Sequence, residues 1–363
     1  MDTLFSPFIN ALHAFPAKIL SYGSNLSFPS LLSALLIAAL FIVFRRGLRK
    51  RTSFRALLHA LFPKSIWHSP STNLDMKYVL ANLFLYVAIV PIATINFLLV
   101  QEAVYSGFVL ALGAPQNISL SEGMCVGIVT FAMFMAYEIA YWTDHYLSHK
   151  IPFLWEFHKV HHSATALTPF TNWRIHPVDG ILFFNFIAFF SAIAHAVTNY
   201  ALNKEYTPFS IAGSNIILLA YFYLYGHLQH SQLWISFRGV TGRIFMSPAH
   251  HQIHHSNASV HYDKNFGGSL ALFDWLFGTL HMPSAKPERL TFGVDNDHHL
   301  QGFVTSTFYP FYFAGRHIGR ACKRIFKKTR PPYSPPKPDI LNPVPAITAT
   351  RIIRDRGEYE RLS

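Results

Sequence analysis

Residues 124–162 read MCVGIVTFAMFMAYEIAYWTDHYLSHKIPFLWEFHKVHH. The first half of this stretch, Met124–Trp142, is an apolar run whose single charged residue is Glu138. The second half carries five histidines, most of them spaced three or four residues apart. An apolar helix that leads directly into paired histidines predicts a membrane-embedded protein with a metal site at the end of a span.

Histidines at one-turn spacing recur further along the chain. Eleven of the 21 histidines fall within residues 145–162 and 227–255, and positions three or four residues apart share one helical face. Imidazole is a neutral ligand that suits iron, zinc, copper and nickel, and two such metals need about four or five each. The pattern predicts a di-metal site between helices of a bundle. The predicted ligands are His145, His149, His158, His161, His162, His227, His230, His251, His254 and His255, with His250 as a neighbour rather than a ligand.

The composition also favours a membrane protein. Hydrophobic residues make up 51% of the 363 residues and charged residues only 13%, whereas soluble domains carry roughly 25% charged residues. The net charge of +12 fits an anionic membrane face better than nucleic acid, because Lys and Arg cluster beside apolar runs. The two cysteines exclude a disulfide scaffold and a four-cysteine iron–sulfur cluster.

Four further apolar runs are candidate membrane segments. Phe28–Phe44 is read as a retained anchor, and Tyr78–Val100 is long enough to span the bilayer, with Pro91 as a kink. Gly180–Tyr200 and Pro208–Tyr225 form a pair that either crosses completely or makes a shallower hairpin. The expected fold is an all-α integral membrane bundle with a cytoplasmic helical cap that carries the histidine site.

The placement of Lys and Arg predicts the orientation. The loop Arg45–Asp75 holds seven of them and the loop Gln101–Gly123 holds none, so the first loop is expected in the cytoplasm. The active site then faces the cytoplasm as well, and this basic face is a candidate docking surface for an acidic electron carrier. The expected regions are an anchor over 1–115, a catalytic domain over 116–285 and a basic, Pro-rich tail over 286–363.

The histidine motifs resemble the fatty acid hydroxylase superfamily, also called the sterol desaturase family. The matching residues lie between about 120 and 280. They are His145-x3-His149, His158-x2-His161-His162, His230 before Ser231, His251-x2-His254-His255, the DKNFGG stretch from Asp263, and the FDWLFGT stretch from Phe273.

The resemblance implies a membrane monooxygenase that hydroxylates a lipid C–H bond. It implies two iron ions held by the histidines, O2 as co-substrate, and two electrons from a separate carrier, either cytochrome b5-like or a ferredoxin with its reductase. Zinc is expected to replace iron in some recombinant protein, since it binds imidazole sites tightly. Candidates for orienting the ligands or contacting the substrate are Asp144, His176, Asn265 and Asp274, with Glu138, Glu156 and Asp179 as further carboxylates.

Two alternatives stay open. A desaturase of the same metal type begins with the same hydrogen abstraction, so the histidine motifs do not separate it from a hydroxylase. A His-rich metal transporter is the second alternative, although transporters usually carry ionisable groups at mid-membrane depth. Here only Glu138 and His195 lie inside apolar runs. The chain contains no GxSxG, HExxH, GxGxxG or P-loop motif, which argues against a serine hydrolase, a zincin and a nucleotide-binding enzyme.

Overall fold

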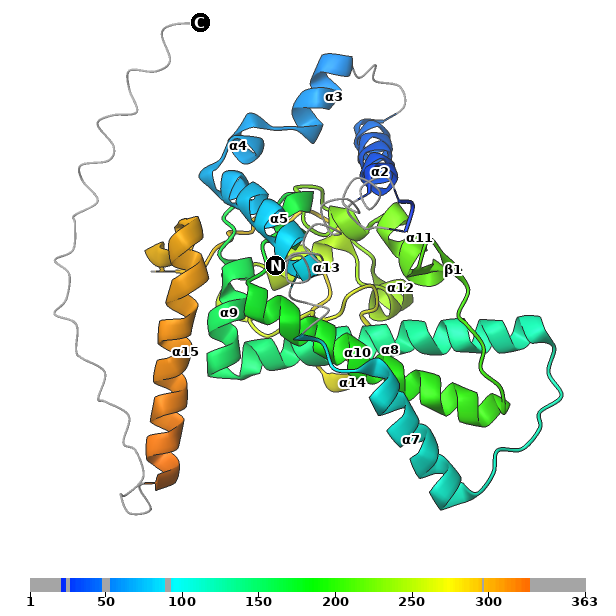
Figure 1. Cartoon of the computed structure of the whole chain (residues 1–363). Coiled ribbons are helices and arrows are strands. Elements are labelled where there is room, and N and C mark those ends of the chain that lie inside the picture. The colour runs from blue at the N-terminus through cyan, green and yellow to red at the C-terminus, as the bar shows by residue number, and fades with distance from the viewer. Residues whose placement is uncertain (1–20, 24–26, 48–52, 89–92, 296, 327–363) are drawn as a thin grey trace, which may run out of the picture. The chain divides into compact units, whose positions relative to one another are not determined.

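The computed structural model describes residues 21–23, 27–47, 53–88, 93–295 and 297–326. Regular structure in these ranges is almost entirely helical, as Figure 1 shows. The strands within them are β1 (Ser210–Ile211) and β2 (Ser214–Asn215), which form one antiparallel hairpin. The all-α prediction is therefore confirmed. The described residues up to Gly319 form one compact unit.

Among the described residues, three helices are long and apolar enough to cross a bilayer: α2 (Phe28–Arg46), α8 (Glu122–Lys150) and α10 (Pro177–Leu202). The shortest of them has 19 residues and rises about 28 Å, close to the bilayer core of about 30 Å. Each begins at a side chain that accepts a hydrogen bond from the first turn, namely Ser27, Ser121 and His176. These caps accept hydrogen bonds from backbone N–H groups of the first turn, which apolar side chains cannot do.

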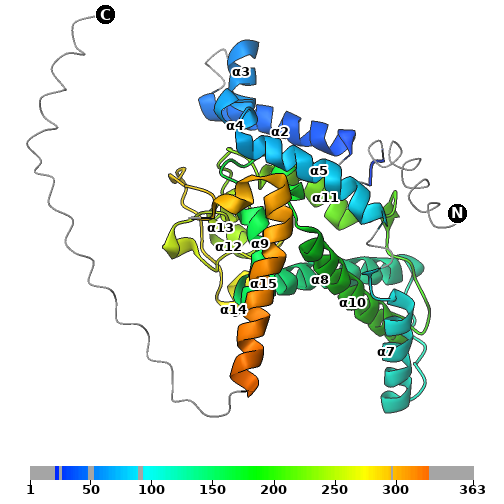
Figure 2. The ribbon, with the colours of Figure 1, turned by 60° about the vertical axis from the view of Figure 1, so that its left-hand side comes forward.

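The α8–α10 pair is the scaffold of the molecule. The two helices pack along each other, and α7 (Phe97–Leu112) packs on α10 (Figure 2). Helix α2 packs against α11 (Ile216–Leu224) and α3 (Phe54–Leu61) through small side chains on one face, including Ala34 and Ala38. The remaining α-helices are α4 (Lys64–Trp67), α5 (Pro70–Ala88), α9 (Pro152–His162), α12 (Gly239–Ile244), α13 (Pro248–His254), α14 (Leu272–Phe277) and α15 (Phe303–Phe326).

Four short 3-10 helices complete the described structure: η1 (Pro169–Trp173), η2 (Gly226–Leu228), η3 (Ser259–His261) and η4 (His298–Gln301). Segments outside the histidine-rich region pack on it. Leu74 and Tyr78 in α5 and Leu300 in η4 form one buried apolar cluster with Val160 in α9. The expected region boundaries at residues 115 and 285 stay predictions.

The apolar run Tyr78–Val100 is not one helix, which corrects the expectation of a single span. Helix α5 is described as far as Ala88, residues 94–96 are not helical, and α7 starts at Phe97, while Pro91 lies outside the described residues. The Asn96 side chain caps α7 by accepting from the Leu99 N–H at 3.1 Å. Asn is among the strongest capping residues, so this local signal overrides the continuous hydrophobicity. The expected loop over 101–123 is correspondingly helical as far as Leu112.

The second arm of the expected pair, Pro208–Tyr225, is too short to span. Its first part is the β1–β2 hairpin, whose turn places Ala212 and Gly213 at positive φ. The helix that follows, α11, has nine residues and rises about 13 Å, less than half of the bilayer core. The shallower of the two alternatives therefore describes this arm. The expected Pro-rich tail, 331–345, lies outside the described residues.

Glu138 in α8 ties the scaffold to the loop that precedes α14. Its fully buried carboxylate accepts hydrogen bonds from the Ser269 hydroxyl at 2.6 Å, the Ser269 N–H at 3.1 Å and the Leu270 N–H at 2.9 Å. We expect Glu138→Gln to lower the free energy of unfolding by about 1–3 kcal/mol, because the amide presents a donor where acceptors are needed. Thermal unfolding in detergent measures the loss. The exposed Glu122 provides a control, and an equal shift for Glu122→Gln would contradict the role of Glu138.

Candidate metal centre

Nine of the predicted ligands form two buried groups in space. The five-histidine group holds His145, His149, His158, His162 and His254, and the four-histidine group holds His161, His230, His251 and His255. Within each group the candidate ligand nitrogens all lie within 4.8 Å of one another. All of these histidines except the half-buried His149 are buried. The structure thus brings together side chains that are up to 110 residues apart in sequence.

Four segments carry the ligands. Helix α8 continues beyond its apolar part and presents His145 and His149 in its last two turns. Pro152 starts α9 immediately afterwards, and α9 carries the first HxxHH motif at its end. The loop after η2 carries His230, and α13 with its C-terminal cap His255 carries the second HxxHH motif.

Each HxxHH motif is divided between the two groups. In α9, His158 and His162 join the five-histidine group, while His161 joins the four-histidine group. In the second motif, His251 and His255 join the four-histidine group, while His254 joins the five-histidine group. Residues four apart lie one above the other on a helix, and the residue between them points to a neighbouring position. Spacing alone does not predict this crossed arrangement.

The Nε2 atoms converge within both groups. In the four-histidine group, Nε2 of His230 lies 3.3 Å from that of His161 and 3.0 Å from those of His251 and His255. In the five-histidine group, Nε2 of His162 lies 3.1 Å from those of His149 and His254. Converging imidazole nitrogens at these distances fit the donor set of a metal ion.

The other ring nitrogen of several ligands is held by an acceptor. Nδ1 of His145 donates to the Phe266 carbonyl at 2.7 Å, and Nδ1 of His254 donates to the Lys264 carbonyl at 2.7 Å. Nδ1 of His158 lies 3.1 Å from the Asp179 carboxylate. A proton held on Nδ1 leaves Nε2 with its lone pair toward the group, which is the tautomer a metal requires. Nε2 of His145 and of His158 is buried without a hydrogen-bond partner among the described residues. Together with the converging Nε2 atoms of both groups, this fits two metal ions.

Burial keeps the ligands neutral. Desolvation lowers the pKa of both His230 and His254 to about 3, and neighbouring imidazoles lower the pKa of His230 further. The same causes hold the pKa of His161 and His255 well below the usual value for histidine. At neutral pH these imidazoles are therefore unprotonated and need to release no proton when a metal binds.

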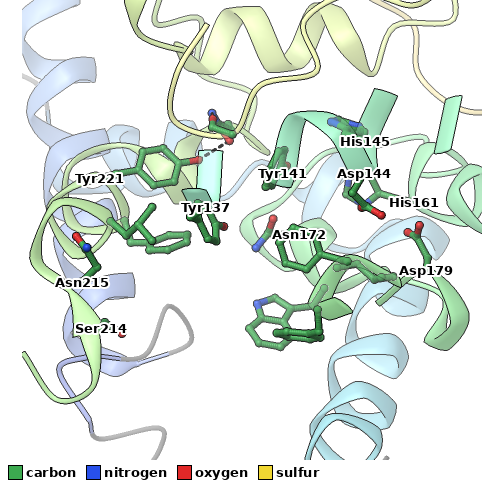
Figure 3. A pocket seen from close by; sticks show the side chains of 18 of the residues that line it. Tyr137, Tyr141, Asp144, His145, His161, Asn172, Asp179, Ser214, Asn215 and Tyr221 are labelled. Carbon is green, nitrogen blue, oxygen red and sulfur yellow. Dashed lines mark hydrogen bonds between the residues drawn. The ribbon is translucent and has the colours of Figure 1, made fainter. Parts of the chain in front are cut away.

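A cavity of about 470 Å³ reaches the two groups. His145, His158 and His161 line the cavity together with Asp144 and Asp179. Figure 3 shows His145, His161, Asp144 and Asp179 on one side of it. The opposite end is lined by Ser214, Asn215 and Tyr221 (Figure 3). Apolar side chains, among them Phe183, Phe184, Leu218 and Phe222, line the cavity as well.

The region that holds these groups matches a known family. Residues 130–279 match the family model described as fatty acid hydroxylase. Residues 130–279 are a fatty acid hydroxylase domain. This confirms the resemblance inferred from the histidine motifs.

Three relatives show the range of named activities around this fatty acid hydroxylase domain. The chain is 27% identical to an ornithine lipid hydroxylase of Rhizobium tropici over 200 residues, which cover 54% of this chain and 53% of the relative. It is 24% identical to the alkylglycerol monooxygenase of Homo sapiens over 188 residues, 52% of this chain and 36% of the relative. It is 26% identical over 171 residues, 46% of this chain and 52% of the relative, to an Arabidopsis thaliana protein named "Putative Delta(7)-sterol-C5(6)-desaturase 2".

The chain thus spans about half the length, or less, of these three relatives. No solved structure matches it.

His227 lies outside both groups, unlike the other nine predicted ligands. Its Nε2 is 3.2 Å from the Ser30 hydroxyl in α2, so its imidazole faces the first span. The spacing of three residues from His230 predicts a shared helical face, but η2 ends at Leu228 and the chain leaves the helix before His230. This break in helical geometry separates the two side chains.

Two of the candidate supporting residues are structural. His176 caps α10 by accepting from the Val178 N–H at 3.1 Å, and its Nε2 donates to the Thr307 carbonyl at 2.9 Å. Asn265 stands at a φ of 60° and bonds to the backbone of His250 and His281. Neither residue is among the described lining residues of the cavity, and a role for either in supporting the site stays a prediction.

Asp274 supports the domain through the loop that holds His145. Its buried carboxylate accepts from the Phe266 N–H at 2.8 Å and the Gly267 N–H at 2.7 Å. The carbonyl of Phe266 in turn accepts from Nδ1 of His145. Asp274 therefore orients a ligand through the backbone, whereas Asp179 contacts His158 directly.

Arg174 is a supporting residue that the histidine motifs did not indicate. Its guanidinium is fully buried and bonds to Asp75 at 3.2 Å, to the Ser163 hydroxyl at 2.9 Å and to the Val160 carbonyl at 3.1 Å. Val160 lies inside the first HxxHH motif, so this ion pair anchors α9 to α5. In the sequence, the RIHP stretch that begins at Arg174 is the one feature that draws attention to this residue. Its partner Asp75 lies 99 residues away.

Acid is expected to destabilise the metal-stripped protein. The folded pKa values of His230 and His254 are about 3, and the unfolded value is about 6.5. The unfolded chain therefore takes up protons as the pH falls below about 6.5, while the folded chain does not. The stability present above this pH is lost progressively toward about pH 3. Thermal midpoints of the detergent-solubilised protein between about pH 7.5 and 5 should fall with pH, and a constant midpoint would contradict the burial of neutral ligands.

Proposed function

We propose that the protein is a membrane di-iron monooxygenase that hydroxylates a C–H bond of a lipid. The observation that carries the proposal is the pair of buried, neutral histidine groups at one end of a largely apolar cavity. The similarity to lipid hydroxylases and monooxygenases supports it. Attack on an unactivated C–H bond needs O2 that has been activated with two electrons. Two irons, when bound, would supply this activation.

The residues of this chain have three tasks in the proposed reaction. The nine grouped histidines would hold the irons, and Asp179, Asp274 and the carbonyls of Phe266 and Lys264 fix the ring orientations that binding requires. The apolar cavity wall would bind the alkyl part of the lipid and exclude water. The spans α2, α8 and α10 would place the cavity where lipids reach it.

The electron source and the orientation are parts of the proposal. The chain would receive electrons from a separate carrier, either cytochrome b5-like or a ferredoxin with its reductase, on the cytoplasmic side. Arg45 and Arg46 lie in the last turn of α2. They support this orientation, because Lys and Arg are more frequent on the cytoplasmic side of membrane spans.

Desaturation of a lipid is the second candidate. It begins with the same hydrogen abstraction, and one relative carries the name of a sterol desaturase. Lipid analysis of a strain that lacks the protein separates the two activities. Hydroxylation predicts loss of lipids that carry one additional oxygen, and desaturation predicts loss of lipids with one additional double bond.

Metal analysis tests the proposed centre. Purified protein should hold about two irons per chain, or zinc in their place, because zinc also binds imidazole sites tightly. One labile zinc per chain together with metal uptake into vesicles would support a transporter and overturn the oxygenase.

A further inference from the structure

Asp144 is one of the two carboxylates that line the cavity. It lines the cavity next to His145 and is 5% exposed, and its Oδ1 has no hydrogen-bond partner among the described residues. It belongs to neither histidine group. Burying a carboxylate oxygen without a partner is costly, and native proteins rarely do so. A ligand in the cavity is the natural source of the missing donor.

The polar side chains at the opposite end of the cavity are already satisfied. Asn215 donates to the Thr130 carbonyl at 2.8 Å and accepts from the Ile217 N–H at 2.9 Å. The Tyr221 hydroxyl donates to Gln229 at 2.7 Å, as Figure 3 shows, and the Ser214 hydroxyl donates to the carbonyl of Gly23. The side chains at that end therefore have less hydrogen-bonding capacity left for a lipid head group than Asp144 has.

The charges that line the cavity also favour a ligand with a hydrogen-bond donor next to Asp144. Two carboxylates, Asp144 and Asp179, line its histidine end, and no Lys or Arg is among its described lining residues. Asp179 is engaged by Nδ1 of His158, whereas Oδ1 of Asp144 is not engaged. The aromatic and aliphatic wall formed by Phe183, Phe184 and Leu218 suits an alkyl chain.

We propose that Asp144 accepts a hydrogen bond from an N–H or O–H group of the lipid, and thereby selects substrates oxidised beside their head group. The inference rests on the proposed function and deepens it, because it names the substrate class. The substrate is an amphiphile with an ammonium or hydroxyl donor within a few bonds of the oxidised carbon. A lipid that places only methylene groups beside Asp144 leaves the carboxylate unpaired, and sites built around a hydrogen bond reject such analogues strongly.

A different role for Asp144 makes a distinct prediction. Nδ1 of His161 is also buried and has no close hydrogen-bond partner among the described residues, and Figure 3 shows His161 beside Asp144. If Asp144 served only to orient His161, its replacement would lower the metal content. A specificity role leaves the metal content unchanged and alters the binding of the lipid.

Binding measurements on the metal-loaded protein in detergent test the proposal. The probes are dodecylamine, 1-dodecanol and 1-methoxydodecane, which share one alkyl chain and differ in donors. Their affinities are referenced to partition into protein-free micelles. The two donor-bearing probes should bind the unaltered protein more tightly than the ether. In Asp144→Asn the affinity for dodecylamine should fall by about tenfold or more, while the affinity for the ether and the metal content stay unchanged.

Asp179→Asn is the matched control, since it removes the other carboxylate of the same cavity. It should lower the metal content because Asp179 holds His158. Loss of metal in Asp144→Asn, or equal binding of all three probes by the unaltered protein, would overturn the proposal.

Product analysis separates this inference from the proposed function. An oxygen found deep in an acyl chain would overturn the role of Asp144 and leave the lipid hydroxylase standing. Donor-dependent binding without any lipid product would support the role of Asp144 and overturn the lipid hydroxylase.

Discussion

Replacement of His230 by Ala is expected to remove at least one of the two proposed metal ions and to abolish turnover. His230 lies at the centre of the four-histidine group, with Nε2 within 3.3 Å of three other ligand nitrogens. Three histidines remain after the change, which is fewer than the roughly four ligands that a metal held by neutral nitrogens needs. Metal analysis of the purified variant by mass spectrometry gives the stoichiometry directly.

His227→Ala is the matched control, because His227 is equally buried and three residues away but lies outside both groups. It should retain both metals. His149→Ala should lose less metal than His230→Ala, since four ligands remain in the five-histidine group. Full metal content in His230→Ala, or loss of a metal in His227→Ala, would contradict the assignment of the groups.

Arg174→Met is expected to lower the free energy of unfolding by about 3–5 kcal/mol, because it leaves the carboxylate of Asp75 buried without its counter-charge. Both side chains are fully buried, and the guanidinium also bonds to the carbonyls of Val160 and Leu300. Thermal or chemical unfolding in detergent measures the loss. Metal content should fall with it, since the bond to Val160 holds the first HxxHH motif.

A double variant separates the ion pair from the packing. Arg174→Met combined with Asp75→Leu removes both charges, and such apolar replacements of buried pairs are often tolerated. It should be more stable than Arg174→Met alone. The exposed Arg289 supplies the surface control, and Arg289→Met should leave stability almost unchanged. A double variant that is less stable than the single one would show that the pair itself is not the origin of the loss.

The sequence predicted the parts of the fold that depend on local pattern. The apolar run from Met124 became α8, and the run Gly180–Tyr200 lies within α10. Nine of the ten predicted ligands meet in two groups, because pairs at helical spacing keep their geometry wherever the helix lies. The resemblance to a known family rested on these same local motifs.

What the sequence did not predict depends on contacts between distant segments. The break before α7 arises from one capping residue, Asn96, within an otherwise continuous apolar run. His227 is directed to Ser30, 197 residues away, and Asp75 is joined to Arg174 across 99 residues. Periodicity carries no information about such partners. The buried carboxylates of Glu138 and Asp274 accept hydrogen bonds from loop backbone, and the periodicity of the sequence does not predict these partners either.

The crossed division of the HxxHH motifs would make the two proposed metal positions cooperative. Helix α9 contributes His158 and His162 to the five-histidine group and His161 to the four-histidine group. The second motif contributes His251 and His255 to the four-histidine group and His254 to the five-histidine group. An ion at either position orders both segments and so lowers the entropic cost of occupying the second. Filling and emptying are therefore linked thermodynamically, and a chain that carries a single ion should be scarce relative to chains with two or none.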